Sequence, residues 1–363
     1  MTPKYLHIAE ILRDQINFNI RNGINKLPTE HSLCQKYSVS RQTVRQAFDL
    51  LIAEGLIERR QGSGTFICDK FFDNSKKFIA ILVSSDNEYT YPSYIKDIKD
   101  VLIPEGYDVE VYVTDNKVST ERRILTQFLT MPISGIIAEP VMSFLPSPNQ
   151  DLYEKLRDRN VSILFGLSTY SNMNDFHYVR SDDVYGGYLL GKYLVQKNHP
   201  RIACLLQQDD NRGIERYQGI MMALTDSHIE LNDDYISWYQ YADLSALRIN
   251  QSAAFITEFI HKQLRTASAV ICQNDEIAYW LIRHLTYNGI RVPEDISIVS
   301  FDNSYLSDFG STHLTSLSHN AHELGRSCAA TLNKMIKQES ISSARLSWHI
   351  IIRSSDAPYR ENI

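Results

Sequence analysis

Cysteine is scarce in this sequence of 363 residues, and long hydrophobic runs are absent. The five cysteines lie far apart, and no two have the Cys-x-x-Cys spacing of a structural zinc site, so we expect buried, reduced thiols and no metal. The N-terminal segment lacks the apolar core of a signal peptide, and no later stretch holds the roughly 18 apolar residues that cross a bilayer. These absences predict a cytoplasmic protein.

Motifs of common enzyme classes are also missing. The sequence has neither a Gly-x-Gly-x-x-Gly loop nor a P-loop, and Gly166-Leu167-Ser168 lacks the second glycine of a nucleophile elbow. The eleven histidines are dispersed without ligand spacing. Two carboxylates, Glu139 and Asp302, could be read as the acid pair of a carbohydrate-active enzyme, which we keep as an alternative. We expect no catalytic residue and no cofactor.

The composition is that of a globular protein, with 43% hydrophobic and 22% charged residues in a chain too long for one compact core. Charge is distributed unevenly along it. Residues 1–70 hold ten Lys or Arg against seven Asp or Glu, whereas the remainder holds 27 against 36. A basic N-terminal segment on an acidic body is what a DNA-binding module attached to a different domain would show.

The first 68 residues have the pattern of three helices followed by a β-hairpin. Apolar side chains recur at helical spacing from Tyr5 to Ile20. Thr29 is a candidate N-cap for a second helix, and Ser40 for a third that ends before Gly55. Two short strands, LIERR and FIC, then surround a Gly-Ser-Gly turn. This order predicts a winged helix-turn-helix domain over residues 1–68.

The third predicted helix and the hairpin turn carry side chains suited to DNA. Arg41 and Arg45 lie one turn apart at the start of that helix, where guanidinium groups would reach guanine or phosphate in the major groove. Gln42 and Thr43 are short polar neighbours suited to the same task. The turn Gln61-Gly62-Ser63-Gly64 has no bulk, so its backbone could approach the minor groove or a phosphate. Singly, these features also suit a solvated helix face and a tight turn; their order favours DNA.

Residues 69–77 break this pattern and are predicted to form a linker. From residue 78 to residue 363, apolar strands alternate with amphipathic helices, as a parallel sheet covered on both faces requires. Strands are predicted over 79–85, 108–114, 135–139, 162–166, 202–206, 269–273 and 296–301. So many strands over roughly 285 residues fit two Rossmann-like lobes better than one sheet.

The segment from Leu27 to Ile67 resembles the DNA-binding domain of the GntR family nearly throughout. The shared elements are Pro-Thr-Glu at 28–30, Val-Ser-Arg at 39–41, Glu-Gly-Leu-Ile at 54–57 and Gly-Ser-Gly-Thr-Phe at 62–66. The resemblance implies operator contacts from the glutamate of the opening, the start of the recognition helix and the tip of the wing. Together with the neighbouring polar residues of the helix start, the predicted contacts are Glu30, Ser40, Arg41, Gln42, Thr43, Arg45, Gln61, Gly62 and Gly64.

Nearly all of residues 78–355 resembles the sugar-sensing domain of LacI-type repressors, itself similar to periplasmic sugar-binding proteins. The stretches that carry the likeness include 181–205, 269–303 with its Asn274-Asp275 pair, and 313–332. The resemblance implies two lobes with a cleft at the carboxyl ends of their strands. Arg216, Asn274 and Asp302 fall on matching ligand-binding positions.

A sugar site needs carboxylates, amides and an arginine for the hydroxyls, and an aromatic face for the ring. Candidates from the first lobe are therefore Tyr89, after the first strand, and Glu139, at the end of the strand 135–139. Asp182 and Asp183 lie where the chain is expected to cross between the lobes. An N-cap role for Asn274, and a purely structural role for Asp183, stay open.

The combination of a GntR-type head and a LacI-like sensor resembles the arabinose repressors of Gram-positive bacteria, so the implied effector is L-arabinose. Another pentose, a hexose, a sugar phosphate or a nucleoside stays open. We expect a transcriptional repressor that binds palindromic operator DNA as a homodimer, with sugar-driven cleft closure releasing the DNA. The hinge-helix motif Tyr-x-Pro-x-x-x-Ala-Arg of LacI-type proteins is missing, which puts coupling by hinge folding in question.

Overall fold

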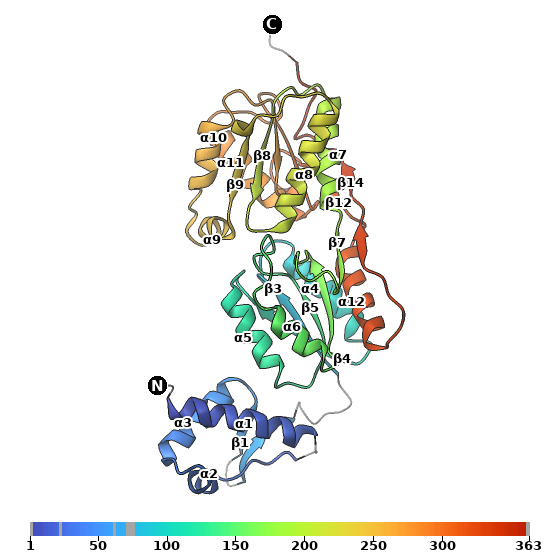
Figure 1. The fold of residues 1–363 in the computed structure, drawn as a ribbon. Helices are drawn as coiled ribbons and strands as arrows, with labels where there is room; N and C mark the ends of the chain where they lie inside the picture. Colours follow the sequence, from blue (N-terminus) through green and yellow to red (C-terminus); the bar gives the residue numbers. More distant parts are fainter. Residues whose placement is uncertain (1–2, 22–23, 61–62, 70–76, 361–363) are drawn as a thin grey trace.

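The computed structural model describes residues 3–21, 24–60, 63–69 and 77–360. Figure 1 shows a small helical head at the N-terminal end and two α/β lobes beyond it. The predicted fold class, a winged helix-turn-helix in front of a two-lobed Rossmann-like domain, is confirmed. No helix within the described ranges is long and apolar enough to cross a membrane.

Three helices and a hairpin form the head: α1 (Lys4–Arg21), α2 (Glu30–Tyr37), α3 (Arg41–Ala53), β1 (Ile57–Arg60) and β2 (Gly64–Ile67). Both predicted caps are present, because the Thr29 hydroxyl accepts from the Ser32 amide at 3.2 Å and the Ser40 hydroxyl from the Thr43 amide at 3.2 Å. All five elements bury apolar side chains in one core, to which α3 contributes the fully buried Phe48. This core fixes the start of α3 relative to the hairpin.

The head touches the first lobe beside the end of α5 (Val118–Phe128). The Gln127 side-chain amide donates to the carbonyl of Glu54, the C-cap residue of α3, at 3.5 Å. Met131 packs against the apolar core of the head. Of the predicted linker, residues 70–76 lie outside the described residues.

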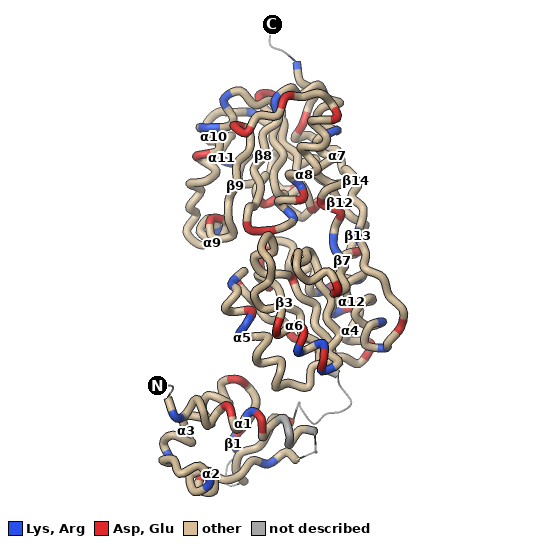
Figure 2. Tube along the Cα trace, in the orientation of Figure 1, with Lys and Arg blue, Asp and Glu red and all other residues tan. Residues whose placement is uncertain are grey.

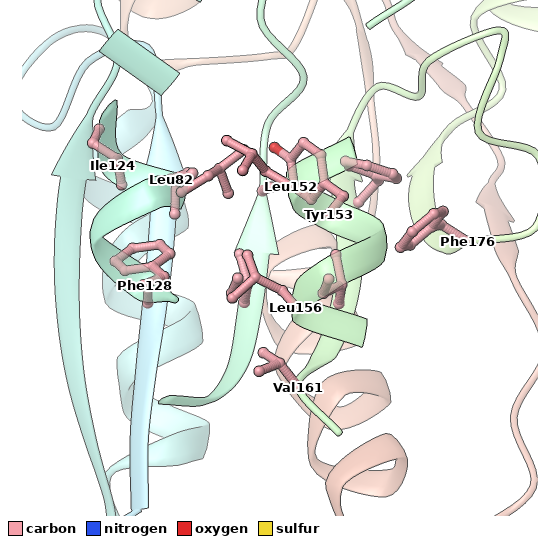
Figure 3. Packing of buried hydrophobic residues seen from close by; sticks show 14 of the residues in the cluster. Leu82, Ile124, Phe128, Leu152, Tyr153, Leu156, Val161 and Phe176 are labelled. Carbon is pink, nitrogen blue, oxygen red and sulfur yellow. The ribbon is translucent and has the colours of Figure 1, made fainter. Parts of the chain in front are cut away.

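The first lobe is a sheet of six parallel strands in the order β13-β7-β6-β5-β3-β4. Figure 3 shows side chains such as Phe128, Tyr153 and Phe176 filling the space between the sheet and helices α5 and α6. The opposite face packs against α4 and α12. Its remaining elements are β3 (Lys77–Val83), α4 (Tyr91–Leu102), β4 (Tyr107–Val113), β5 (Ile133–Ala138), α6 (Gln150–Arg157), β6 (Ser162–Leu167), β7 (His177–Ser181), α12 (Glu323–Ile336) and β13 (Ala344–Leu346).

The second lobe repeats this plan in the order β14-β12-β11-β10-β8-β9, and β14 runs antiparallel to β12. Buried apolar residues again lie on both faces of the sheet. Its elements are α7 (Asp183–Gln196), β8 (Ile202–Gln207), α8 (Asn211–Asp226), β9 (Ile236–Tyr239), α9 (Tyr241–Asn250), α10 (Ala254–Lys262), β10 (Ala269–Cys272), α11 (Asp275–Tyr287), β11 (Ser297–Phe301), β12 (Thr315–Ser318) and β14 (His349–Ile351).

Glycines allow α7 and α8 to approach each other closely. A Cβ at Gly187 would lie 2.1 Å from the Arg216 carbonyl oxygen, and one at Gly219 would lie 1.9 Å from the Val184 carbonyl oxygen. Neither position accepts a side chain unless a helix moves. The contact therefore fixes α8, and Arg216 with it, against the first turns of α7.

The chain crosses between the lobes at three places, visible at the right of Figure 1. The first crossing (residues 181–183) joins β7 to α7, the second (318–323) joins β12 to α12, and the third (346–349) joins β13 to β14. The first and third crossings lie side by side, because Leu346 pairs with Ser181 and the Leu346 carbonyl accepts from the Asp182 amide at 3.0 Å. These crossings form the connection about which the lobes can rotate.

Candidate DNA-reading surface and effector cleft

Glu30, the first residue of α2, forms ion pairs with three arginines at the surface of the head. Its carboxylate accepts from Arg41 Nε at 3.0 Å and lies 3.7 Å from both Arg45 Nε and Arg59 Nη2. The side chains of Arg41 and Arg45 are 76% and 60% exposed, so these ion pairs are weak and can exchange for contacts with phosphate or guanine. The structure thus brings together three predicted DNA contacts and adds Arg59.

The remaining predicted contacts surround this cluster or lie in the wing. The Ser40 hydroxyl caps α3 and lies 2.8 Å from the Thr43 hydroxyl, while Gln42 is exposed. Gly64 begins β2 with a φ of 116°, a conformation that favours glycine. Gln61 and Gly62 lie outside the described residues. The start of α3 therefore presents a polar, cationic edge to solvent.

A cleft lies between the two lobes, at the carboxyl ends of strands from both sheets. Figure 2 shows acidic residues interspersed with basic ones where the lobes face each other. The cleft contains about 750 Å³ of space, its open mouth included. This is the edge at which open α/β sheets bind ligands. Its polar and aromatic lining includes Ser84, Tyr89, Tyr91, Asn116, Glu139, Gln207, Asp209, Asp210, Arg212, Arg216, Tyr241, Arg248, Gln273, Asn274 and Asp302.

Glu139 is the central acceptor on the first-lobe side. It is 6% exposed and accepts from the Ser84 amide at 2.7 Å, the Ser84 hydroxyl at 2.9 Å and the Tyr91 hydroxyl at 2.9 Å. Burial raises the pKa of Tyr91 well above its ordinary value, so the phenol stays a donor. Arg212 Nη2 of α8 donates to the same carboxylate at 3.1 Å. Glu139 is therefore a fixed acceptor that contacts both lobes.

Arg216 of α8 is the central donor on the second-lobe side of the cleft. Its Nε donates to Asp183 Oδ1 at 2.8 Å, its Nη1 donates to the Gln273 carbonyl, and its Nη2 lies 3.7 Å from Asp302 Oδ1. The guanidinium carbon lies 4.0 Å from the centre of the Phe301 ring. Burial raises the pKa of Asp183 to about 6, although Arg216 opposes the shift. The contacts with Asp183, the Gln273 carbonyl and the Phe301 ring hold the guanidinium in one position at the cleft wall.

Asp302 and Asn274 complete the second-lobe side. Asp302 has a φ of 95°, a strained conformation of the kind that collects at binding sites, and its Oδ2 accepts from the Tyr89 hydroxyl at 2.9 Å. Asn274 Oδ1 caps α11 by accepting from the Ile277 amide at 3.0 Å. No hydrogen bond within the described ranges uses its Nδ2. Asn274 can therefore cap the helix and still donate to a ligand.

Asp275 supports the turn that carries Asp302. Its carboxylate is fully buried and accepts from the Ser300 hydroxyl at 2.5 Å, the Ser316 hydroxyl at 2.6 Å and the Ser304 amide at 2.5 Å. Burial raises its pKa to about 7, and the nearby charge of Asp302 adds to the shift. Asp275 therefore positions Asp302 in the cleft by fixing the turn that carries it.

Five of the seven predicted ligand residues line the cleft, namely Tyr89, Glu139, Arg216, Asn274 and Asp302. The other two do not belong to the lining. Asp182 caps α7 by accepting from the Tyr185 amide at 3.2 Å, and Asp183 is fully buried beside Arg216. Both aspartates therefore have structural partners at the first crossing, as the structural alternative for Asp183 anticipates.

Sequence reasoning missed Tyr91, Arg212 and Arg248, which also line the cleft. One signal could have found Arg212. Asp210 follows the buried strand β8 and caps α8 through the Arg212 amide, which places the first turn of that helix at the carboxyl edge of the sheet. Tyr91 and Arg248 carry no such local signal, because their place in the cleft depends on contacts distant in sequence.

Direct contacts join the lobes across the cleft. The lobes are therefore in a closed arrangement in this structure, in which protein groups partner one another across the space a ligand would enter. The bridging pairs include Glu139–Arg212, Tyr89–Asp302, Glu88–Arg248 and Ser143–Asp210.

Two family descriptions match the chain. Residues 4–67 match the bacterial regulatory proteins of the gntR family, and residues 192–355 match a periplasmic binding protein-like domain.

The arabinose metabolism transcriptional repressor of Halalkalibacterium halodurans is 31% identical over 345 residues, covering 93% of this chain and 91% of that protein. The protein of the same name from Geobacillus stearothermophilus is 30% identical over 341 residues, covering 93% of each.

Solved structures share the fold of the two lobes. A LacI family transcriptional regulator from Enterococcus faecium with bound ribose superposes with a TM-score of 0.64 at 23% identity, covering 78% of this chain and all of that one. The complex of the transcriptional regulator CelR with cellobiose gives a TM-score of 0.65 at 21% identity and covers 93% of this chain and 94% of that one.

Proposed function

The chain belongs to the family of arabinose metabolism transcriptional repressors, and from that premise we propose that L-arabinose is the effector that releases it from operator DNA. A gntR-type head and a LacI-like, periplasmic-binding-protein-like domain make it a sugar-responsive repressor. We propose that the sugar occupies the interlobe cleft and that the head binds DNA. No catalytic residue and no cofactor form part of the proposal.

The charge balance of the cleft carries the proposal of a neutral sugar. Arg212, Arg216 and Arg248 each contact a carboxylate, at 2.5 Å from Asp210, 2.8 Å from Asp183 and 2.5 Å from Glu276 respectively. A sugar phosphate would have to displace these carboxylates or bury its charge beside them. Sugar hydroxyls, which both donate and accept, suit such paired groups. A neutral pentose is therefore favoured over a phosphorylated one.

We assign the ligand contacts to the five predicted residues that line the cleft. Glu139 and Asp302 accept from sugar hydroxyls, while Asn274 Nδ2 and Arg216 donate to sugar oxygens. Tyr89 supplies an aromatic surface beside Asp302. Because Glu139 belongs to the first lobe and Arg216, Asn274 and Asp302 to the second, a sugar that contacts these groups stabilises the closed arrangement.

In the head, we propose that Arg41, Gln42, Thr43 and Arg45 enter the major groove at the start of α3. The full proposed set also contains Glu30, Ser40, Gln61, Gly62 and Gly64. We propose a homodimer, since two heads related by a twofold axis match a palindromic operator. The proposal includes a cytoplasmic location, where operator DNA lies, and the domain limits 1–68, 69–77 and 78–363.

Two binding measurements test this function. Calorimetric titration with L-arabinose, D-xylose, D-ribose, D-galactose and ribose 5-phosphate should show that L-arabinose binds most tightly and the phosphate fails to bind. Selection from random duplexes should enrich a palindrome that the protein releases when L-arabinose is added. If another ligand binds and L-arabinose does not, the effector assignment is wrong although the architecture stands. If no duplex is enriched, the DNA-reading assignment is wrong.

A further inference from the structure

His319 lies where the three interlobe crossings meet. It belongs to the second crossing, its Nε2 lies 2.7 Å from Ser181 Oγ of the first, and its Nδ1 lies 3.0 Å from the Ser347 carbonyl of the third. Because a carbonyl can only accept, Nδ1 carries the proton and Nε2 accepts from the serine hydroxyl. Burial lowers the pKa of His319, which favours this neutral ring. A single imidazole therefore joins all three crossings.

The same ring is connected to the cleft by a row of packed side chains. His319 stacks on Trp348 with 3.7 Å between ring centres and 25° between their planes. Trp348 is 6% exposed and packs edge-on against Phe301 at 5.7 Å. Arg216, in the cleft wall, lies 4.0 Å from the centre of the Phe301 ring and 5.8 Å from that of Trp348. The row thus runs from the hinge to a proposed sugar contact.

Tight packing prevents Trp348 from moving independently of its surroundings. A Cβ at Gly186, in the first turn of α7, would lie 2.6 Å from the indole ring, so α7 and Trp348 are in close contact. Since α7 directly follows the first crossing, a shift of the indole must be shared with that segment. Side chains packed this closely transmit displacement instead of absorbing it.

We infer that His319 is the positioning residue of the interlobe hinge: it holds the three crossings in the closed arrangement and links them, through Trp348 and Phe301, to Arg216. This inference rests on the proposed function, because it gives the contact a role in the response to the sugar. We call His319, Ser181, Ser347 and Trp348 the hinge clasp. If His319 stabilised only its own loop, its contacts would lie within the second crossing. Instead, the hinge clasp joins residues of all three crossings.

Opening of the cleft changes the backbone angles of the crossings and stretches the hydrogen bonds of the clasp. Without those bonds the closed arrangement loses part of its advantage over the open one. When the open arrangement predominates in the absence of sugar, a sugar that binds the closed arrangement then binds more weakly by the same factor. Two neutral hydrogen bonds correspond to about a tenfold loss of L-arabinose affinity. Operator affinity without sugar should stay within twofold of the wild type.

The test uses the full-length protein and His319→Phe, which keeps a ring against Trp348 and removes both hydrogen bonds. His349→Phe is the matched control, because His349 is exposed and lies next to Trp348 in sequence. Ser181→Ala removes one bond of the clasp from a different crossing and serves if His319→Phe folds poorly. Hydrogen exchange by mass spectrometry is measured without sugar, followed by L-arabinose titration and operator binding.

The clasp predicts faster exchange at residues 180–183, 317–320 and 345–348 together in His319→Phe, and at the second crossing in Ser181→Ala. Faster exchange only at the mutated segment, or an equal change in His349→Phe, overturns the clasp. Faster exchange at all three crossings with unchanged L-arabinose affinity overturns the link to the cleft. If wild-type protein does not bind L-arabinose, the effector assignment falls, while the exchange measurement still decides the clasp.

Discussion

Replacing Arg216 by methionine should leave a buried carboxylate without its cation. Asp183 is fully buried, and within the described ranges its Oδ2 has no hydrogen-bond partner, so Arg216 Nε at 2.8 Å is its main support. Methionine keeps apolar contact with Phe301 and removes the charge. Breaking a buried ion pair in this way costs about 3–5 kcal/mol, of which proton uptake by Asp183 recovers part. We therefore expect the free energy of unfolding to fall by about 3 kcal/mol.

Tryptophan fluorescence during urea unfolding measures this loss selectively. All three tryptophans, Trp238, Trp280 and Trp348, lie in the second lobe or in the third crossing, so the signal reports the lobe that contains the pair. The double variant Asp183→Asn/Arg216→Met removes both charges. Its loss of unfolding free energy should be smaller than the sum of the two single-variant losses by at least about 1.5 kcal/mol. Additivity within about 0.5 kcal/mol would refute the reasoning, because independent residues behave that way.

The contribution of Asp183 to the free energy of unfolding should depend on pH in a defined direction. Folding raises the pKa of Asp183 to about 6, mainly through burial. A carboxyl with a raised pKa stabilises the fold fully below its unfolded pKa of about 4 and loses that contribution as the pH rises through 6. The unfolding free energy of the wild type, measured relative to Asp183→Asn, should therefore decrease between about pH 4 and 6. An increase over that range would contradict the burial of this charge.

Three further substitutions test the other parts of the molecule. Arg45→Ala should weaken operator binding about tenfold in a fluorescence anisotropy titration and leave L-arabinose affinity intact, and loss of both would point to misfolding instead. Glu139→Gln removes the negative charge and one of the two acceptor oxygens, which weakens the contacts with sugar hydroxyls and with Arg212. Calorimetry should therefore show at least about tenfold weaker L-arabinose binding, and unchanged affinity would exclude Glu139 from the site. Gly219→Ala places a Cβ 1.9 Å from a backbone oxygen and should cost about 1–3 kcal/mol in urea unfolding, more than Gly135→Ala, whose Cβ meets only side-chain ends at 3.0 Å or beyond.

Local sequence patterns predicted most elements of the fold. The seven expected strands correspond to β3, β4, β5, β6, β8, β10 and β11, whose apolar runs are long enough to stand out. Strands β7, β9, β12 and β13 were not predicted, because they are short and mix polar with apolar side chains. The caps Thr29 and Ser40 were predictable, since an N-cap needs only a few consecutive residues.

The site was less predictable, because its geometry depends on pairs distant in sequence. Glu139 could be proposed from its place at the end of a strand, but its contact with Arg212 joins residues of two lobes. Asp182 and Asp183 were expected near the ligand, and the helix start uses one as a cap and buries the other. Only the arrangement of the three crossings brings His319 to Ser181 and Ser347.

The central claim is that one ligand in the cleft and one DNA duplex on the head oppose each other's binding. The most direct test measures operator affinity with and without saturating L-arabinose, and L-arabinose affinity with and without saturating operator. Linkage requires the two factors to be equal, and allosteric coupling typically lies between about 5-fold and 150-fold. We predict equal weakening in both directions within that range. Operator affinity that stays the same at saturating L-arabinose would contradict the account.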